Sequence, residues 1–295
     1  MRKFIIAVAG LLILAAIGAA TWRWLLTAPQ DPPFAVALKV GDSSQRAVNG
    51  ATPLYFSVFV SKSRGAQQAR IGTAGEPWYA HLAIEPLEPQ RTPQFRWSLL
   101  GRPRSVYVRH DGRANLTNLA MYEGAEAVFD DVRRIYTAEF GLAPEQVVQL
   151  PAGRHAYRAV LTSDSWLPWQ WRGRVASAPI WLTVEGPVVS VTPASEAARL
   201  AESAGFYSRA GRFEDARRAA QSLVQASPTD SGYHMLLGDA LNGLRRDNDA
   251  LKEYRDALLL LAAEKHHGHR DAPEYLFMRI EEVQARMRPA QPATK

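Results

Sequence analysis

The chain divides into regions with different hydrophobic periods. Between residues 34 and 191 apolar side chains recur at every second position, as in a strand with one buried face. The clearest runs are 34–40, 54–60 and 78–85, and turn-forming Gly, Pro, Asn and Asp residues lie between them. This pattern predicts an antiparallel β-sandwich over residues 31–192.

The end of this region carries a more specific pattern. His155, Tyr157, Ala159 and Leu161 alternate with other residues, and a second apolar run follows at 177–184. This part resembles the last two strands of an immunoglobulin-like or fibronectin-like domain, whose corner tyrosine would fall at His155 or Tyr157. The resemblance implies an immunoglobulin-like sandwich. Because the region exceeds the ~100 residues of one such domain, we expect an elaborated sandwich with residues 114–132 inserted and partly helical.

Residues 193–288 show a helical period and an internal repeat with an offset of 34 residues. Its two units align small and apolar positions, which are the pairs Ala204 and Gly238, Tyr207 and Leu241, Ala216 and Ala250, Ala220 and Tyr254, and Leu223 and Ala257. The pattern resembles the tetratricopeptide repeat. That resemblance implies two antiparallel helical hairpins, followed by a capping helix with Leu276, Ile280, Val283 and Met287 on one face and by a flexible tail over 289–295.

In the tetratricopeptide family the first helix of each hairpin lines a ligand-binding groove. The resemblance therefore implies a partner-binding groove that presents Arg209, Met235, Asp239 and Asn242. One cation, one anion, one amide and one methionine suit a peptide ligand. The alternative is that these four are ordinary surface residues.

Residues 1–30 predict export from the cytoplasm. Arg2 and Lys3 precede an uncharged run over 4–22, which as a helix would span about 29 Å, close to the thickness of a hydrocarbon core. We predict a signal-anchor transmembrane helix with a cytoplasmic N-terminus and with the bulk of the chain in the periplasm. The alternative is a signal peptide cleaved after the small residues 18–20.

A tryptophan-rich loop is a second candidate for recognition. Trp166, Trp169 and Trp171 lie within six residues, beside Arg172 and Arg174. Large amphipathic rings next to arginines are typical of recognition surfaces, where they contact protein, glycan or lipid headgroups. The alternative is that the rings fold back over the end of the sandwich or onto the helical region.

Charge and composition narrow the possible functions. The net charge of +6 is spread thinly, and residues 193–295 hold equal numbers of acids and bases, so we expect no nucleic-acid binding. The chain has no cysteine, which excludes disulfides and thiolate sites. It carries no serine elbow, phosphate-binding glycine loop or His-Glu-x-x-His motif. His266, His267 and His269 with Asp271 suit a solvated turn better than a metal site. We therefore predict no enzyme activity, no cofactor and no metal.

Together these patterns predict a multidomain α and β chain: a transmembrane helix (1–30), an immunoglobulin-like sandwich (31–192), a tetratricopeptide-like helical domain (193–288) and a tail (289–295). The predicted function is that of a membrane-anchored extracytoplasmic scaffold or adaptor, an assembly factor that binds protein partners of the cell envelope. The alternative is a glycan- or cell-wall-binding module that uses the tryptophan loop of the sandwich.

Overall fold

The fold was obtained as a computed structural model. It describes residues 33–41, 47–49, 52–63, 69–71, 77–90, 92–107, 120–121, 127–129, 134–164, 171–185, 192–264 and 272–288.

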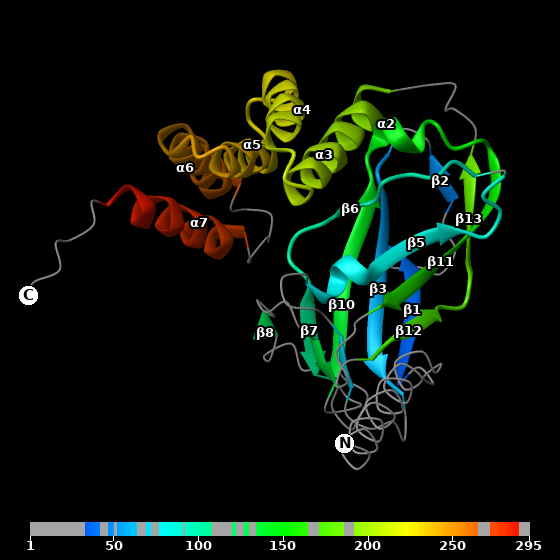
Figure 1. The fold of residues 1–295 in the computed structure, drawn as a ribbon. Helices are drawn as coiled ribbons and strands as arrows, with labels where there is room; N and C mark the ends of the chain where they lie inside the picture. The colour runs from blue at the N-terminus through cyan, green and yellow to red at the C-terminus, as the bar shows by residue number, and fades with distance from the viewer. Residues whose placement is uncertain are drawn as a thin grey trace, which may run out of the picture.

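Two β-sheets pack face to face in the first part of the chain (Figure 1). The larger sheet has the strand order β1-β3-β10-β7-β8, and β6 also pairs with β10. Its neighbouring strands are antiparallel. The strands are β1 (Phe34–Val40), β3 (Leu54–Lys62), β6 (Ser98–Leu99), β7 (Arg104–Tyr107), β8 (Ala120–Met121) and β10 (Arg134–Leu142).

The second sheet has the order β12-β11-β13-β2, with β5 also paired to β11. Its strands are β2 (Ala47–Asn49), β5 (Leu82–Pro86), β11 (Gly153–Ser163), β12 (Gly173–Ala176) and β13 (Ile180–Glu185). A separate small pair joins β4 (Ala69–Ile71) to β9 (Ala127–Phe129), and the short helices are η1 (Trp78–His81) and α2 (Pro144–Val147).

Alternation along β3 shows why these residues form strands. Leu54, Phe56, Val58 and Val60 are buried, whereas the residues between them are partly exposed. The inward side chains meet those of the second sheet, among them Tyr157 of β11, in one hydrophobic core. A period of two therefore places every second β3 side chain between the sheets.

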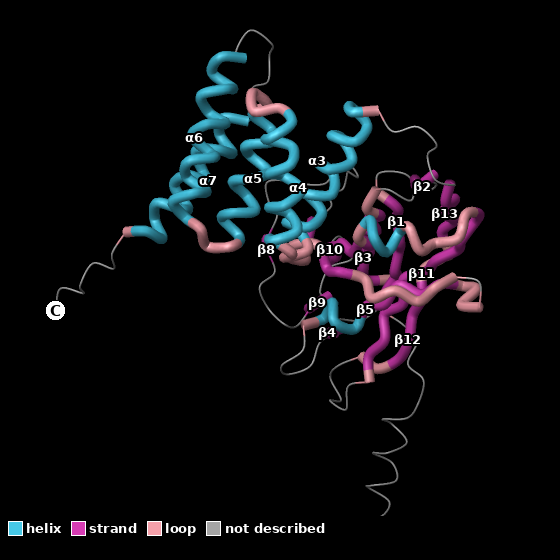
Figure 2. Tube along the Cα trace, turned by 90° about the horizontal axis from the view of Figure 1, so that it is seen from above, coloured by secondary structure: helices cyan, strands magenta, loops and turns pink. Residues whose placement is uncertain are grey.

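Five longer helices follow the sandwich: α3 (Pro193–Arg209), α4 (Phe213–Ala226), α5 (Ser231–Gly243), α6 (Asp247–Glu264) and α7 (Ala272–Met287). The hydroxyl of Thr192 accepts a hydrogen bond from the Ser195 amide at the start of α3, and the carboxylate of Asp230 accepts from two amides at the start of α5. Such N-caps satisfy backbone donors that the helix leaves free. Figures 1 and 2 agree that α3 lies next to the sheets and that α6 and α7 lie farther away.

Small residues let these helices approach one another. Ala204, Ala216 and Ala250 are fully buried, and a Cβ built on Gly238 would stand 2.6 Å from the ring of Tyr254. The two residues that the repeat pattern pairs, Ala204 and Gly238, thus both lie in close helix packing.

The predicted fold class is wrong where it includes a transmembrane helix. The structure is a mixed α and β fold, with two main sheets followed by helices. Within the described ranges no helix combines the length and the apolar character needed to cross a membrane. Residues 1–30, on which that prediction was placed, lie outside the described residues.

Two further details differ from the expected sandwich. β2 pairs with β13 in parallel, in register Thr183 with Ala47, where purely antiparallel pairing was expected. Period-two alternation reports only which face is buried, so it cannot distinguish the two directions. The insertion at 114–132 was expected to be partly helical, but its described residues form the short strands β8 and β9.

Candidate functional site

A buried aromatic side chain of α3 packs the helical unit against the sandwich. Phe206 of α3 is fully buried in a cluster with Leu100 and Ala143, and its ring packs edge-on against Tyr55 with centroids 5.7 Å apart. Gly141 of β10 makes room for this ring, because a Cβ there would lie 2.5 Å from it. Phe206 therefore fixes α3 against the end of the larger sheet.

Polar contacts surround this apolar junction. Arg209, one of the predicted groove residues, pairs with Glu139 of β10, and its guanidinium lies 5.6 Å from the centre of the Tyr55 ring. The backbone carbonyl of Arg209 accepts a hydrogen bond of 2.8 Å from the amide of Gly101. Arg209 thus holds the two parts of the chain together.

Glu145 of α2 forms the second polar contact across the junction. Its carboxylate accepts a 2.9 Å hydrogen bond from the Tyr207 hydroxyl and pairs with Arg212. Burial acts to raise the pKa of Glu145, but the hydrogen bonds from Arg212 and Tyr207 outweigh it, so the net pKa lies below the ordinary value of 4.5. The ionised form of Glu145 is the one that the junction stabilises.

The other predicted groove residues lie on α5, where α7 reaches two of them. Asp239 accepts hydrogen bonds from the hydroxyls of Tyr254 and Tyr275, both at 2.8 Å. Asn242 is buried and accepts from Arg286 of α7. Met235 is partly buried against the helical core. These side chains make contacts within the chain, and the structure places Arg209 apart from them at the sandwich.

The charges at the α5–α7 contact match its hydrogen bonds. Burial and the charge of Asp239 raise the pKa of Tyr275 to about 12, so its hydroxyl stays protonated and donates to the carboxylate. Arg279 adds an ion pair to Asp239 at 3.5 Å. The face of α5 that was predicted to line a groove is therefore a helix–helix contact.

α7 leaves part of its apolar surface uncovered. Leu276 and Val283 are fully buried in the helical core, whereas Phe277 is 57% and Met287 is 44% exposed. Ile280 is partly buried against the same core. A helix has about 3.6 residues per turn, so Phe277, Ile280 and Met287 fall within an arc of about 80° that borders the buried side chain of Leu276. We call Phe277, Ile280 and Met287 the α7 patch.

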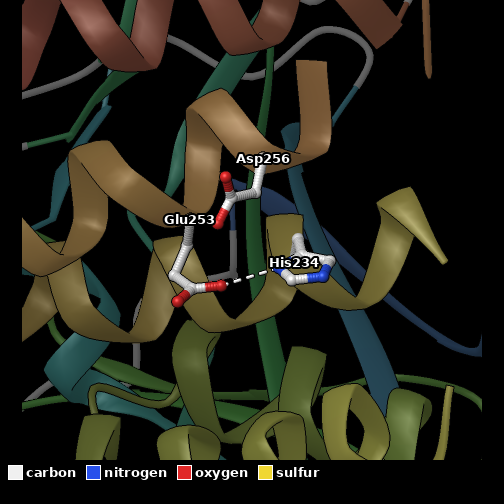
Figure 3. Close-up of side chains that lie close together, drawn as sticks. All are labelled: His234, Glu253 and Asp256. Atoms are coloured by element: carbon white, nitrogen blue, oxygen red, sulfur yellow. Dashed lines mark hydrogen bonds and ion pairs between the residues drawn. The ribbon is translucent and has the colours of Figure 1, made fainter. Parts of the chain in front are cut away.

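A second cluster joins α5 to α6, as Figure 3 shows. The Nδ1 atom of His234 lies 2.7 Å from a carboxylate oxygen of Glu253, and its Nε2 lies 3.0 Å from the carbonyl oxygen of Pro228. Asp256 stands one turn beyond Glu253, and the potential ligand atoms of His234, Glu253 and Asp256 lie within 4.8 Å of one another.

The electrostatics of this cluster favour the protonated, positively charged form of His234. Burial lowers the pKa of His234, but the bond to Pro228, the bond to Glu253 and the charges of Glu253 and Asp256 outweigh it, so the net pKa is raised. His234 itself is buried, and both carboxylates are partly exposed.

The structure describes only part of the tryptophan loop. Trp171 is a core residue, packed edge-on against Phe34 with ring centroids 5.1 Å apart. Arg172 is partly exposed. Trp166 and Trp169 lie outside the described residues, as do His266, His267, His269 and Asp271.

Sequence reasoning missed both the α7 patch and the His234 cluster. Ile280 and Met287 were assigned to the packed face, and Phe277 was not singled out, although an apolar arc wider than the core contact was a usable signal. Glu253 and Asp256 are three residues apart on one helix, but their histidine partner lies on another helix. No local motif links them.

Comparison with known proteins does not indicate a family or a function for this chain. No protein-family model matches the chain, and no curated protein matches it. Among solved structures, the chain is similar to the crystal structure of AggA, the major subunit of aggregative adherence fimbriae type I from Escherichia coli. The identity is 16%, the TM-score is 0.27, and the alignment covers 54% of this chain and 99% of that one. A similarity this weak carries no argument about fold or function.

Proposed function

We propose that the protein is a non-catalytic extracytoplasmic adaptor whose helical unit binds a protein partner through the α7 patch. The observation that carries the proposal is that α7 buries Leu276 and Val283 in the helical core but leaves Phe277 and Met287 exposed. Met278 is exposed as well, and exposed apolar side chains that lie close together are a common feature of protein-binding surfaces.

The junction with the sandwich supports this role. Phe206 and Arg209 hold α3 on the larger sheet, Arg212 adds an ion pair to α2, and α4 to α7 extend from this junction (Figure 1). A partner held on α7 would therefore keep a defined position relative to the sandwich. Fixed spacing between two modules is what an adaptor requires.

The chemistry of the patch indicates the kind of partner that would bind it. An aromatic, an aliphatic and a thioether side chain along one helix face suit an apolar helical segment, packed as one helical hairpin packs on the next. Interpretation of the hairpins as tetratricopeptide-like belongs to this proposal. The predicted groove residues Asp239 and Asn242 are not part of the proposed binding surface, because α7 contacts them.

The extracytoplasmic location rests on sequence alone. The basic residues Arg2 and Lys3 and the uncharged run over 4–22 favour export of everything that follows. Envelope proteins are therefore the partners that we propose, and cell fractionation with an antibody against the sandwich tests the location.

Co-purification with matched variants tests the docking role. The tagged full chain is recovered from the cells that produce it, and its co-purifying proteins are quantified for wild type, for Phe277→Ser with Met287→Ser, and for Leu259→Ser. Leu259 is a suitable control, since it is 70% exposed on α6 outside the patch. Circular dichroism establishes that each variant is folded.

Under the proposal, one defined protein is recovered with wild type and with Leu259→Ser, and its recovery falls at least about tenfold with the patch variant. That loss corresponds to about 1.4 kcal/mol, as expected for truncation of interface anchors. Equal recovery with all three proteins would contradict a docking role of the α7 patch.

A further inference from the structure

The hydrogen bonds of His234 determine which of its ring nitrogens is free to bind a cation. A carbonyl oxygen can only accept, so Nε2, 3.0 Å from the Pro228 oxygen, carries a proton. In the neutral ring the lone pair is then on Nδ1, which faces a Glu253 oxygen at 2.7 Å. Two lone pairs at this distance repel each other, so a cation is needed here. A second proton fits the gap as it stands, whereas a metal ion with bonds of about 2 Å fits once the Glu253 carboxylate moves back by roughly half an ångström.

The surroundings of His234 resemble those of metal ligands. A metal-binding histidine commonly donates its other ring N–H to a carbonyl or carboxylate, which fixes the ring orientation and the tautomer. The Pro228 carbonyl does this for His234, and the ring is buried, so its orientation is fixed before any ion binds.

The two carboxylates indicate the charge of the cation. Glu253 and Asp256 are three residues apart on α6 and so project from the same side of the helix toward α5 (Figure 3). A second proton on His234 would neutralise only one of these charges. A divalent ion would neutralise both, and two carboxylates with one imidazole are a donor set that Zn²⁺ accepts.

We propose that His234 Nδ1, Glu253 and Asp256 bind a divalent transition-metal ion of the zinc class, with water completing the coordination. The ion would connect α5 to α6, and through the Pro228 carbonyl it would also fix the turn that precedes α5. It would thus stabilise the second hairpin, on which α7 packs.

Metal titration of the full chain tests this site. To remove adventitious binding at the His-rich stretch, His266, His267 and His269 are replaced by Gln in every protein compared. Binding of Zn²⁺ and Co²⁺ is measured by equilibrium dialysis, and the visible absorption of Co²⁺ reports on its coordination. The variants are His234→Gln and Asp256→Asn, and the control is Asp249→Asn, an exposed carboxylate on the same helix.

Asp256→Asn is the decisive variant, since it keeps the size of a partly exposed side chain and removes the charge that acts on His234. Circular dichroism verifies that the variant keeps its fold. We expect one ion per chain in the triple-Gln background and in the Asp249→Asn control. Affinity should fall by more than the roughly 10–100-fold seen when an outer-sphere contact is lost, in both Asp256→Asn and His234→Gln.

Undiminished binding in folded Asp256→Asn would overturn the proposal. So would the absence of binding in the triple-Gln background. In the second case His234 and Glu253 would form only an imidazolium–carboxylate pair.

Discussion

At the scale of single residues, glycines determine where the large rings pack. A Cβ on Gly141 would lie 2.5 Å from Phe206, and one on Gly243 would lie 2.1 Å from Phe213. Gly238 has the same relation to Tyr254, at 2.6 Å. Each pair joins a glycine on one element to an aromatic ring on another. A larger residue at any of these glycines would therefore disturb the packing between two elements.

Gly141→Ala tests this at the junction between the sandwich and α3. The added methyl group would displace the Phe206 ring, and overpacking of this kind costs about 1–3 kcal/mol. Urea unfolding at neutral pH should show that loss. The matched control is Gly205→Ala on α3, where a Cβ meets nothing within 4 Å. That substitution should stabilise the chain by about 0.5–1 kcal/mol, and equal destabilisation by both would contradict the account.

Glu145 gives the junction a pH dependence. Its pKa is lower in the folded chain than the unfolded value near 4.5, so its contribution is present above that value and is lost as the pH falls through the folded pKa. The melting temperature of wild type should therefore fall more steeply below about pH 5 than that of Glu145→Gln. The effect should be small, because the side chain is 48% exposed. Parallel curves for the two proteins would show that Glu145 does not stabilise the fold.

At the scale of elements, the hydrophobic period indicated where strands and helices lie better than it indicated which other elements they pair with or pack against. The alternation over 34–40 coincides with β1, and the alternation over 54–60 falls within β3. The parallel pairing of β2 and the contact of α7 with Asp239 were not predictable in this way. Both depend on which elements meet in space. A one-dimensional period does not carry that information.

The candidate site shows the same limit. Asp239 and Asn242 are polar residues on a helix, and sequence alone could not show that Tyr275 and Arg286 would reach them from 36 and 44 residues away. Trp171 was grouped with a recognition loop, but it lies in the core against Phe34. Polar and aromatic side chains serve both packing and binding, and only their neighbours distinguish the two roles.

Phe206→Ala tests the junction as an element. Removal of this buried ring should cost about 3–5 kcal/mol, as for other core phenylalanines. It should also separate melting of the helices, followed by far-ultraviolet circular dichroism, from melting of the sandwich, followed by tryptophan fluorescence. Phe277→Ala, which truncates an exposed ring, should change stability by no more than about 0.5 kcal/mol. A single unshifted transition in Phe206→Ala would mean that the ring does not couple the two parts.

At the scale of the whole molecule, the sandwich and the helices together hold the α7 patch in a fixed position. Phe206 and Arg209 hold α3 on the larger sheet, and Arg212 pairs with Glu145 of α2. The helical core then continues through the hairpins to Leu276 and Val283. The proposed adaptor role follows from this arrangement, because an exposed apolar face is held at a fixed place relative to a second module.

Site-specific photo-crosslinking in living cells tests that role most directly. A photoreactive amino acid replaces Phe277 in the patch, and in a matched control it replaces Gln225, an exposed residue on α4. We expect irradiation to join the chain at position 277 to one protein partner, and we expect this product to be missing at position 225. The same products at both positions, or no product at position 277, would contradict the proposal that α7 is a docking surface.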